Sequence, residues 1–221
     1  MVRETIAEAI KNLPEIELQY APRIYQWIPD RQLIVAFSDI HYGANIRVEG
    51  LNGDVLNEFN HEVFEKRMEK LLDEVVDIIR KENINHVHVF LVGDLLDGMI
   101  RQTQLMRLEY GLIESTIRIS EYLAHWFSEL AAHCGVVDVY ASSGNHSEVR
   151  PLKSKKREYP DENMERIIIW YLSERLRGSN RVLIHDECKK YIKANVCGYS
   201  FLLLHGDSEK SIQDLSTEII R

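Results

Sequence analysis

The sequence is short of cysteine, of long apolar runs and of positive charge. Its three cysteines, Cys134, Cys188 and Cys197, are odd in number and lack CxxC spacing, which favours reduced thiols over a disulfide framework. No apolar run approaches the roughly 18 residues that a membrane span requires, and the charged start "MVRETIAEAIKNL" is unlike a secretory signal. We therefore expect a cytoplasmic protein with no membrane partner. The net charge of −8 argues against a general nucleic-acid coat but allows a local basic patch.

The 221 residues are enough for one large α/β domain. We divide them into an N-terminal helix with an extended lead-in (1–30) and a main domain (31–221). Apolar runs, helical periodicity and turn residues predict the elements. They are a helix over 3–12, a strand over 33–37, a polar loop over 43–60, a helix over 61–81 capped by Asn60, a strand over 86–92, a helix over 102–133, a strand over 136–141, a helix over 162–177 and antiparallel strands over 181–185, 190–196 and 199–205. This order predicts a layered α/β sandwich with a mixed sheet.

Four of the predicted strands end in residues that can bind metal ions, and three of these ends adjoin a glycine. In chain order the residues are Asp39 and His41, Asp94 and Asp97, Asn145 and His146, and His205. Taken singly, each group also fits a polar turn, a helix cap or a hydrogen-bonded histidine. Four such groups indicate one composite site, because α/β sheets build sites from the ends of several strands.

The residue types predict a site for two divalent cations. Aspartate, asparagine and histidine without cysteine suit Mn²⁺ first, with Fe²⁺ or Zn²⁺ as alternatives, and disfavour an all-oxygen Ca²⁺ cage. A carboxylate can bridge two cations, and Asp94 lies in the middle of the set. Two such cations can activate a bridging hydroxide and clamp a phosphoryl group. The proton for the leaving oxygen must then come from a side chain, such as an imidazole oriented by a carboxylate.

The combined motifs resemble those of the calcineurin-like metallophosphoesterases. They are "DIH" (39–41), "GDLLD" (93–97), "GNH" (144–146) and "HG" (205–206). The resemblance runs from about residue 33 to 206 and implies a two-sheet mixed β-sandwich flanked by helices.

The resemblance also implies two ligand sets that share Asp94. One set consists of Asp39, His41 and Asp94, and the other consists of Asp94, Asn145 and His205. By the same resemblance, His146 donates a proton or a hydrogen bond in the transition state, and Asp97 orients it.

The chain departs from the family pattern in two places. The family normally has a later Gly-His-x-His that completes both metal sites, whereas no histidine follows His205 here. Because the end, "SIQDLSTEIIR", is typical of an unfinished helix, we expect a C-terminal truncation that removes the final strands and two ligands. His185 is the first candidate for a substitute ligand. Ser147 stands where many phosphatases of the family have an acid directly after the histidine, which argues against a protein phosphatase.

Within the family, "SDIHYG" and the long helix after "GDLLDG" are most similar to the DNA-repair exonucleases, including phage-type members, which cleave DNA with manganese. A basic loop near His146 supplies candidate phosphate-binding residues. They are Arg150, Lys153, Lys155, Lys156 and Arg157. A solvated surface loop could have the same composition. The alternatives are a nucleotide or cyclic-nucleotide phosphodiesterase, a phosphomonoesterase, or a non-catalytic scaffold, and a homodimer is a further expectation.

The remaining histidines fit structural roles. His86 and His88 alternate on a strand and are expected to be polar cross-strand neighbours. His125 and His133 are expected to be packing or surface residues of a helix.

Overall fold

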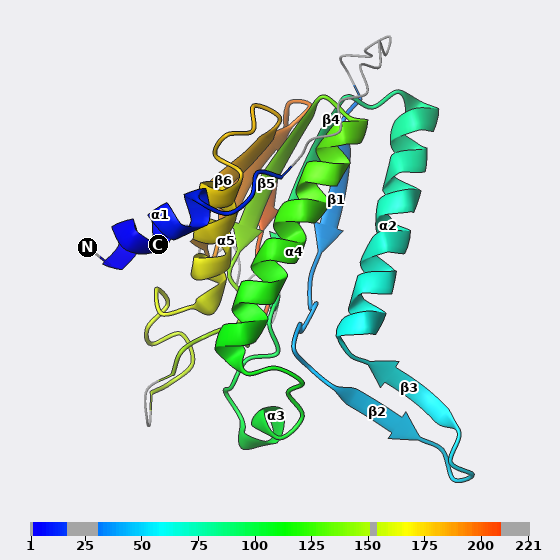
Figure 1. Cartoon of the computed structure of the whole chain (residues 1–221), viewed down its shortest axis with the longest axis vertical. Coiled ribbons are helices and arrows are strands. Elements are labelled where there is room, and N and C mark those ends of the chain that lie inside the picture. Colours follow the sequence, from blue (N-terminus) through cyan, green and yellow to red (C-terminus); the bar gives the residue numbers. More distant parts are fainter. Residues whose placement is uncertain (1, 17–30, 151–153, 209–221) are drawn as a thin grey trace.

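Five helices are interspersed among eight strands in the described part of the computed structural model, residues 2–16, 31–150 and 154–208 (Figure 1). The helices are α1 (Val2–Lys11), α2 (His61–Glu82), α3 (Gln102–Leu105), α4 (Leu112–His133) and α5 (Met164–Arg175). The strands are β1 (Leu33–Phe37), β2 (Ile46–Glu49), β3 (Val55–Phe59), β4 (His86–Val92), β5 (Val136–Ser142), β6 (Val182–Lys189), β7 (Ile192–Val196) and β8 (Tyr199–Leu203). The four polar motifs follow β1, β4, β5 and β8.

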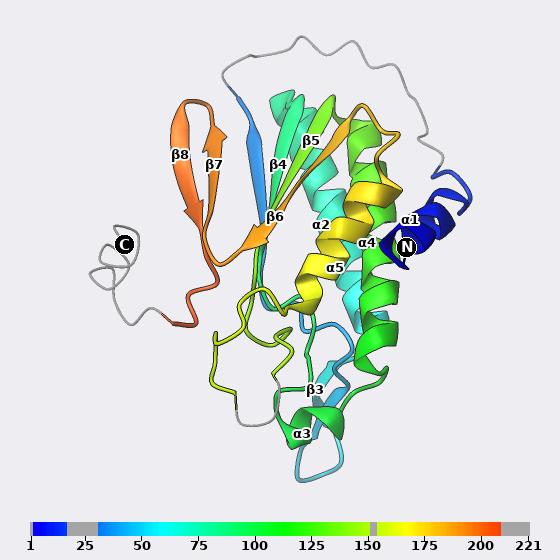
Figure 2. The same cartoon turned by 90° about the vertical axis from the view of Figure 1, so that its left-hand side faces the viewer.

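Four parallel strands form the central sheet in the order β1-β4-β5-β6. Helices α2, α4 and α5 lie on one face of this sheet, and β7 and β8 lie on the other (Figure 2). The inner strands are continuous apolar runs because both faces are covered. On the helical side, Val87, Val89 and Leu91 of β4 share one core with Leu123 and Phe127 of α4. Parallel alignment places the carboxyl ends of the strands at one edge, where α/β proteins form ligand sites.

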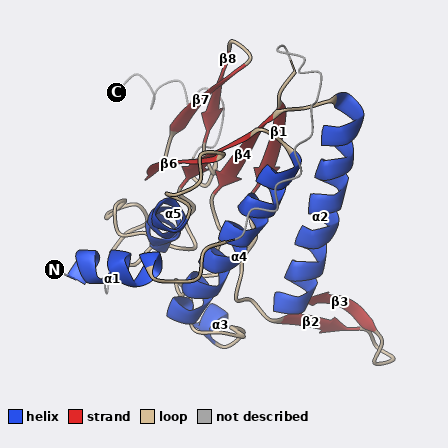
Figure 3. Ribbon diagram, turned by 45° about the horizontal axis from the view of Figure 1, so that its top comes forward, coloured by secondary structure: helices blue, strands red, loops and turns tan. Residues whose placement is uncertain are grey.

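The antiparallel pair β7–β8 makes a second, smaller sheet. Phe90 of β4 packs with apolar side chains of this pair, including Ile192, Ala194 and Leu203. Figure 3 shows this pair on the side of the central sheet away from the long helices. The predicted α/β architecture of two sheets flanked by helices is confirmed.

Residues 43–60 form more than the predicted polar loop, because they contain the β2–β3 hairpin. Its turn is closed by the Gly50 amide, which donates to the Asp54 carbonyl at 2.7 Å. The hairpin lacks the alternation of buried and exposed residues by which a strand is predicted, and Val48 and Leu56 are both exposed.

The predicted helix over 102–133 is two helices, α3 and α4, with a break between them. The backbone between α3 and α4 forms hydrogen bonds with the loop after β1 instead of continuing the helix. The Asn45 amide donates to Arg107 O at 2.7 Å, and the Glu109 amide donates to Gly43 O at 2.8 Å. These long-range bonds replace helical ones and bring Arg107 next to the carboxyl ends of the strands.

Strand β6 also differs from the prediction, since it pairs with β5 in parallel. Helix α5 carries the chain back along the sheet after β5, so the next strand runs in the same direction. Of the last three strands, only β7 and β8 pair antiparallel.

Two smaller predictions, the Asn60 cap and the reduced cysteines, are confirmed. Asn60 caps α2 by accepting a hydrogen bond from Val63 N at 2.9 Å. The three cysteines are free thiols. No helix in the described part of the chain is long and apolar enough to cross a membrane. The predicted lead-in, including the boundary at residue 30, falls on residues 17–30, which lie outside the described residues.

Candidate active site

Backbone hydrogen bonds join the loop after β1 to the loop after β4. The Asp39 amide donates to Gly93 O at 3.2 Å, and the His41 amide donates to Asp94 O at 2.9 Å. One ligand atom each from Asp39, His41 and Asp94 lies within 4.8 Å of the other two. The structure therefore brings together the three residues assigned to the first cation.

Asp39, His41 and Asp94 share an uncommon backbone conformation. Their φ angles are 53°, 49° and 53°, in the left-handed region that residues with a side chain rarely adopt. Such conformations persist where the surrounding structure imposes them, and they cluster at functional sites. Here the hydrogen bonds between the two loops hold the turns that gather the three side chains.

His205, just after β8, adds a side chain from the second sheet. Its Nε2 lies 3.0 Å from Asp94 Oδ2, and its Nδ1 lies 3.0 Å from the Val92 carbonyl oxygen. The hydrogen bond to Asp94 raises the pKa of His205 to about 9. Donation of one ring N–H to a backbone carbonyl is also how proteins orient a histidine whose other nitrogen binds a metal.

These residues fit divalent cations. Carboxylates and imidazoles are suitable ligands for Mn²⁺, Fe²⁺ and Zn²⁺. The buried Nδ1 of His41 has no hydrogen-bond partner among the described residues. Burial, and then the neighbouring His146, lower the pKa of His41, which favours the neutral ring that ligation requires. Asp94 lies close to both His41 and His205, and its role as a bridging ligand stays a prediction.

The turn after β5 packs directly against Asp94. A Cβ atom on Gly144 would meet Asp94 N at 2.1 Å, so this close approach requires glycine. The His146 amide donates to Asp94 Oδ1 at 2.8 Å. Asn145 lies between these two residues in the same turn and is half-buried, and its role as a ligand of the second cation stays a prediction.

His146 lies between the Asp94 and Asp97 carboxylates. Its Nδ1 is 3.0 Å from the Asp97 carbonyl oxygen and 3.7 Å from the Asp97 carboxylate, while its Nε2 is 3.9 Å from Asp94 Oδ2. Its ring meets that of His41 edge-on, with centroids 4.5 Å apart. The Asp97 carboxylate raises the pKa of His146, against the opposing effect of burial. The ring is thus stabilised with a proton, beside the ligands assigned to the cations.

Arg107 and Gln104, which the sequence did not reveal, support this arrangement. Arg107 binds the Asp97 carboxylate with two hydrogen bonds of 2.8 and 3.0 Å. Burial alone would raise the pKa of Asp97, but the nearby His146 ring and the hydrogen bonds from Arg107 lower it to about 2. The Gln104 amide lies 2.8 Å from the Asp97 carbonyl and 2.9 Å from His146 Nδ1. Both residues lie in the stretch predicted as one helix. Because the break in that helix was not predicted, the approach of these two residues to Asp97 and His146 was not predicted either.

Glu165, at the start of α5, links two of the site loops. Its buried carboxylate accepts hydrogen bonds from Gly144 N at 2.7 Å, Leu95 N at 2.8 Å and Ser147 Oγ at 2.9 Å. Burial raises the pKa of Glu165, and the three donors oppose that effect. Asn163, the N-cap of α5, donates to Gly144 O at 2.9 Å. The sequence shows only an ordinary helix start here, so neither residue was predicted.

Part of the predicted basic loop is bound within the protein. Arg157 donates to Ser143 O at 3.2 Å and to Asp207 Oδ1 at 2.8 Å. Lys156 Nζ lies 2.7 Å from Asp207 Oδ2. These bonds connect the turn after β5 to the segment after His205.

The other members of the basic loop differ in their surroundings. Arg150 pairs with buried Glu148 at 2.7 Å. Lys155 is exposed. Lys153 lies outside the described residues. Phosphate binding by this loop stays a prediction, and Lys155 and Lys156 are its exposed described members.

The Asp207 ion pairs predict a pH-dependent stability. Burial alone would raise the pKa of Asp207, but hydrogen bonds from Arg157 and Lys156 lower it to about 2. A carboxyl whose pKa is depressed on folding stabilises the protein above its ordinary pKa and loses this effect as the pH falls through the folded value. We expect Asp207→Asn to lower the free energy of unfolding by about 2 kcal/mol at pH 7, and by progressively less from about pH 4 to pH 2.

Urea denaturation at several pH values measures this difference. The matched control is Asp161→Asn, because the Asp161 side chain is 84% exposed in its pair with Arg166 and such pairs contribute little. A difference between parent and Asp207→Asn that does not change between pH 7 and pH 2.5 would contradict the prediction.

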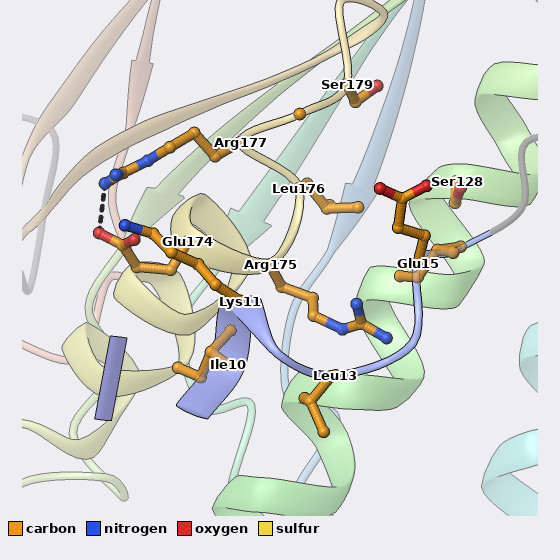
Figure 4. Close-up of a pocket in the computed structure, with 12 residues that line it drawn as sticks. Ile10, Lys11, Leu13, Glu15, Ser128, Glu174, Arg175, Leu176, Arg177 and Ser179 are labelled. Carbon is orange, nitrogen blue, oxygen red and sulfur yellow. Dashed lines mark hydrogen bonds and ion pairs between the residues drawn. The ribbon is translucent and has the colours of Figure 1, made fainter. Parts of the chain in front are cut away.

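Other predicted or prominent features lie elsewhere. His185, the candidate substitute ligand, is bound to Asp138 at 2.7 Å within the sheet and does not join the strand-end residues. His125 is an exposed residue of α4, as expected. A cavity of about 550 Å³ lies between α1 and the end of α5 and is lined in part by Lys11, Arg175 and Ser128 (Figure 4). None of its lining residues belongs to the four strand-end motifs.

Comparison with known proteins is consistent with this geometry. The family model described as calcineurin-like phosphoesterase matches residues 33–218. The chain is also 29% identical, over 98% of its length, to the SPbeta prophage-derived uncharacterized protein YonJ of Bacillus subtilis (strain 168). It spans 53% of that relative's length.

Proposed function

Because the chain belongs to the calcineurin-like phosphoesterases, we propose that it is a two-metal phosphodiesterase that cleaves DNA. The observation that carries the proposal is the arrangement around Asp94. Two imidazole groups and a second carboxylate gather at this side chain, and the ring of His146 lies beside them. Such a set suits a phosphoryl group held between cations and a proton donor.

The protein residues have separate tasks in this proposal. Asp39, His41, Asp94, Asn145 and His205 would hold the two cations, with Mn²⁺ as the preferred metal. When bound, the cations would supply a nucleophile and neutralise charge on the phosphoryl oxygens. His146 would give its Nε2 proton to the oxygen that leaves phosphorus, and Asp97 would stabilise the protonated ring. Arg107 would hold the Asp97 carboxylate in place.

DNA is the preferred substrate because of the likeness to exonuclease motifs and the basic loop. Its exposed Lys155 is available to a phosphate backbone. The matched relative is prophage-derived and described as uncharacterized, so it supports a phage context but no substrate. Nicked or linear DNA, compared with closed circular DNA, separates an exonuclease from an endonuclease.

His146→Ala is expected to lower kcat for phosphodiester hydrolysis by roughly 10²- to 10⁴-fold, the usual contribution of a general acid. The loss should be larger for DNA than for bis-p-nitrophenyl phosphate, because nitrophenolate leaves with less need for a proton. The measurement is Mn²⁺-dependent hydrolysis of both substrates. The assay uses the 221-residue chain and a version extended past Arg221, since the chain spans about half of its relative.

His125→Ala is the matched control, because it removes an exposed histidine that pairs with Glu121 on α4. It should retain full activity. If neither version of the parent hydrolyses either diester and His146→Ala behaves identically, the enzyme proposal fails in favour of a binding role. Faster hydrolysis of p-nitrophenyl phosphate than of the diester would instead identify a phosphomonoesterase.

Three further expectations remain proposals. A cytoplasmic location agrees with the free thiols of the described residues. A homodimer can be tested by sedimentation. The C-terminal truncation, with a Gly-His-x-His expected past Arg221, also stays a proposal.

A further inference from the structure

A second group of metal-binding side chains lies within the central sheet. It consists of His86 and His88 on β4, Asp138 on β5 and His185 on β6. One ligand atom each from His86, His88 and Asp138 lies within 4.8 Å of the other two. His88 and Asp138 are direct neighbours in the parallel register of β4 and β5.

This cluster is separate from the strand-end site. His86 and His88 alternate with buried valines and therefore share a face with Phe90, which packs against the β7–β8 sheet. His88 precedes Asp94 by six residues, or roughly 20 Å along an extended strand. A ligand of this cluster therefore would not touch the strand-end residues.

The rings are held in place around Asp138. His86 Nε2 lies 2.5 Å from one carboxylate oxygen and His185 Nε2 lies 2.7 Å from the other. His86 stacks on His88 with centroids 4.2 Å apart, and His185 stacks on Tyr140 with centroids 4.1 Å apart. Burial alone would raise the pKa of Asp138, but hydrogen bonds from His185 and His86 lower it. The Asp138 carboxylate is thus held between the imidazoles of His86 and His185.

Hydrogen bonds among the described residues account for only one of the two ring nitrogens of His88. His88 is 2% exposed, and its Nε2 lies 2.8 Å from Gln32 Oε1. Its Nδ1 is buried and has no hydrogen-bond partner among the residues that the structure describes.

A neutral imidazole has one N–H, and Gln32 Oε1 can only accept it. With Nε2–H bound to Gln32, the Nδ1 of His88 keeps a free lone pair. A buried acceptor without a partner is costly. Donation of the other ring N–H to an amide oxygen is the arrangement that orients a metal-binding histidine.

We propose that His86, His88 and Asp138 form a separate transition-metal site that takes Zn²⁺, with His185 next to it as a fourth ligand or as a support for Asp138. Two imidazoles and one carboxylate are a common zinc set, and they disfavour Mg²⁺ and Ca²⁺. Ligand atoms around a tetrahedral zinc are roughly 3.3 Å apart, so the side chains, whose ligand atoms lie within 4.8 Å of one another, would have to rotate when the ion binds. The side chain of His86 is 27% exposed and that of His185 is 43% exposed, which gives an ion a route from solvent.

A simpler role, in which the histidines only neutralise Asp138, accounts for His86 and His185. It leaves the buried Nδ1 of His88 without a function. A bound cation would satisfy this nitrogen and the carboxylate together.

The test is Zn²⁺ binding by the folded chain in an Asp94→Asn background, which weakens the strand-end site. After equilibrium dialysis against Zn²⁺ alone, elemental analysis should find one zinc per chain in this background. Addition of either His88→Ala or Asp138→Asn should remove it. Asp138→Asn is nearly isosteric, and circular dichroism checks that each variant is folded. Co²⁺ provides a second measurement, because its visible absorption should change with the same substitutions.

His133→Ala is the control, since His133 also pairs with a carboxylate, Glu129, but lies on α4. It should leave zinc content unchanged. Absence of stoichiometric zinc in the Asp94→Asn background, or equal zinc content with and without His88→Ala and Asp138→Asn, would overturn the proposal. Phosphodiesterase activity is not the measurement, so the result does not depend on the proposed function.

Discussion

Asp94→Asn is expected to weaken divalent-cation binding at the strand ends and to lower kcat/KM for phosphodiesters by roughly 10³- to 10⁴-fold, which corresponds to the several kcal/mol that bound cations contribute. The physical reason is the central position of Asp94. It lies with Asp39 and His41 in one ligand cluster, and its Oδ2 is 3.0 Å from His205 Nε2. Removal of its charge therefore weakens both proposed cation positions at once.

The substitution is chosen because asparagine preserves the local packing. Its amide oxygen can still accept the hydrogen bond that Asp94 Oδ1 receives from His146 N at 2.8 Å. Mn²⁺ stoichiometry and initial rates should therefore fall without loss of folded structure. Asp77→Asn is the control, because the Asp77 side chain is 79% exposed on α2. Unchanged Mn²⁺ content and turnover in Asp94→Asn would exclude Asp94 as a ligand.

Glu165→Ala is expected to lower the free energy of unfolding by roughly 3–5 kcal/mol, because it leaves buried donors without an acceptor. The donors are Gly144 N, Leu95 N and Ser147 Oγ. A loss of this size is a large share of the roughly 5–15 kcal/mol that stabilises a typical domain. Urea denaturation measures it, and the midpoint should fall at constant slope.

Glu165→Gln should be less destabilising than Glu165→Ala, because the amide retains one accepting oxygen. The control is Glu121→Ala, which also removes a carboxylate with three partners, Arg175, Tyr171 and His125, but one whose side chain is 33% exposed. The Glu165 variants should also bind Mn²⁺ more weakly, since Glu165 positions Gly144 and Leu95 next to the ligands. A stability loss with unchanged Mn²⁺ affinity would assign Glu165 a purely structural role.

Contacts between residues that are far apart in the sequence explain most of the differences between the predicted and the observed elements. The helix predicted over 102–133 breaks because its connecting segment bonds to residues near Gly43, and the hairpin within 43–60 has no buried face to mark it. Strand β6 is parallel because α5 intervenes. Each of these results depends on partners that local periodicity does not include.

The sequence by itself determined where the central strands run and which ligand-capable residues follow them. Length of apolar run, glycine turns and side-chain chemistry are local properties, and they identified Asp39, His41, Asp94, His146 and His205 as candidates. Only the tertiary structure decided which other residues support them. Glu165 contacts Leu95 across 70 positions of sequence, and Arg107 reaches Asp97 only because a helix breaks. Likewise, His88 and Asp138 look like ordinary strand residues in the sequence, and only the parallel register of β4 and β5 places them side by side. The geometry of such a cluster depends on which strands pair, and not on spacing along one strand.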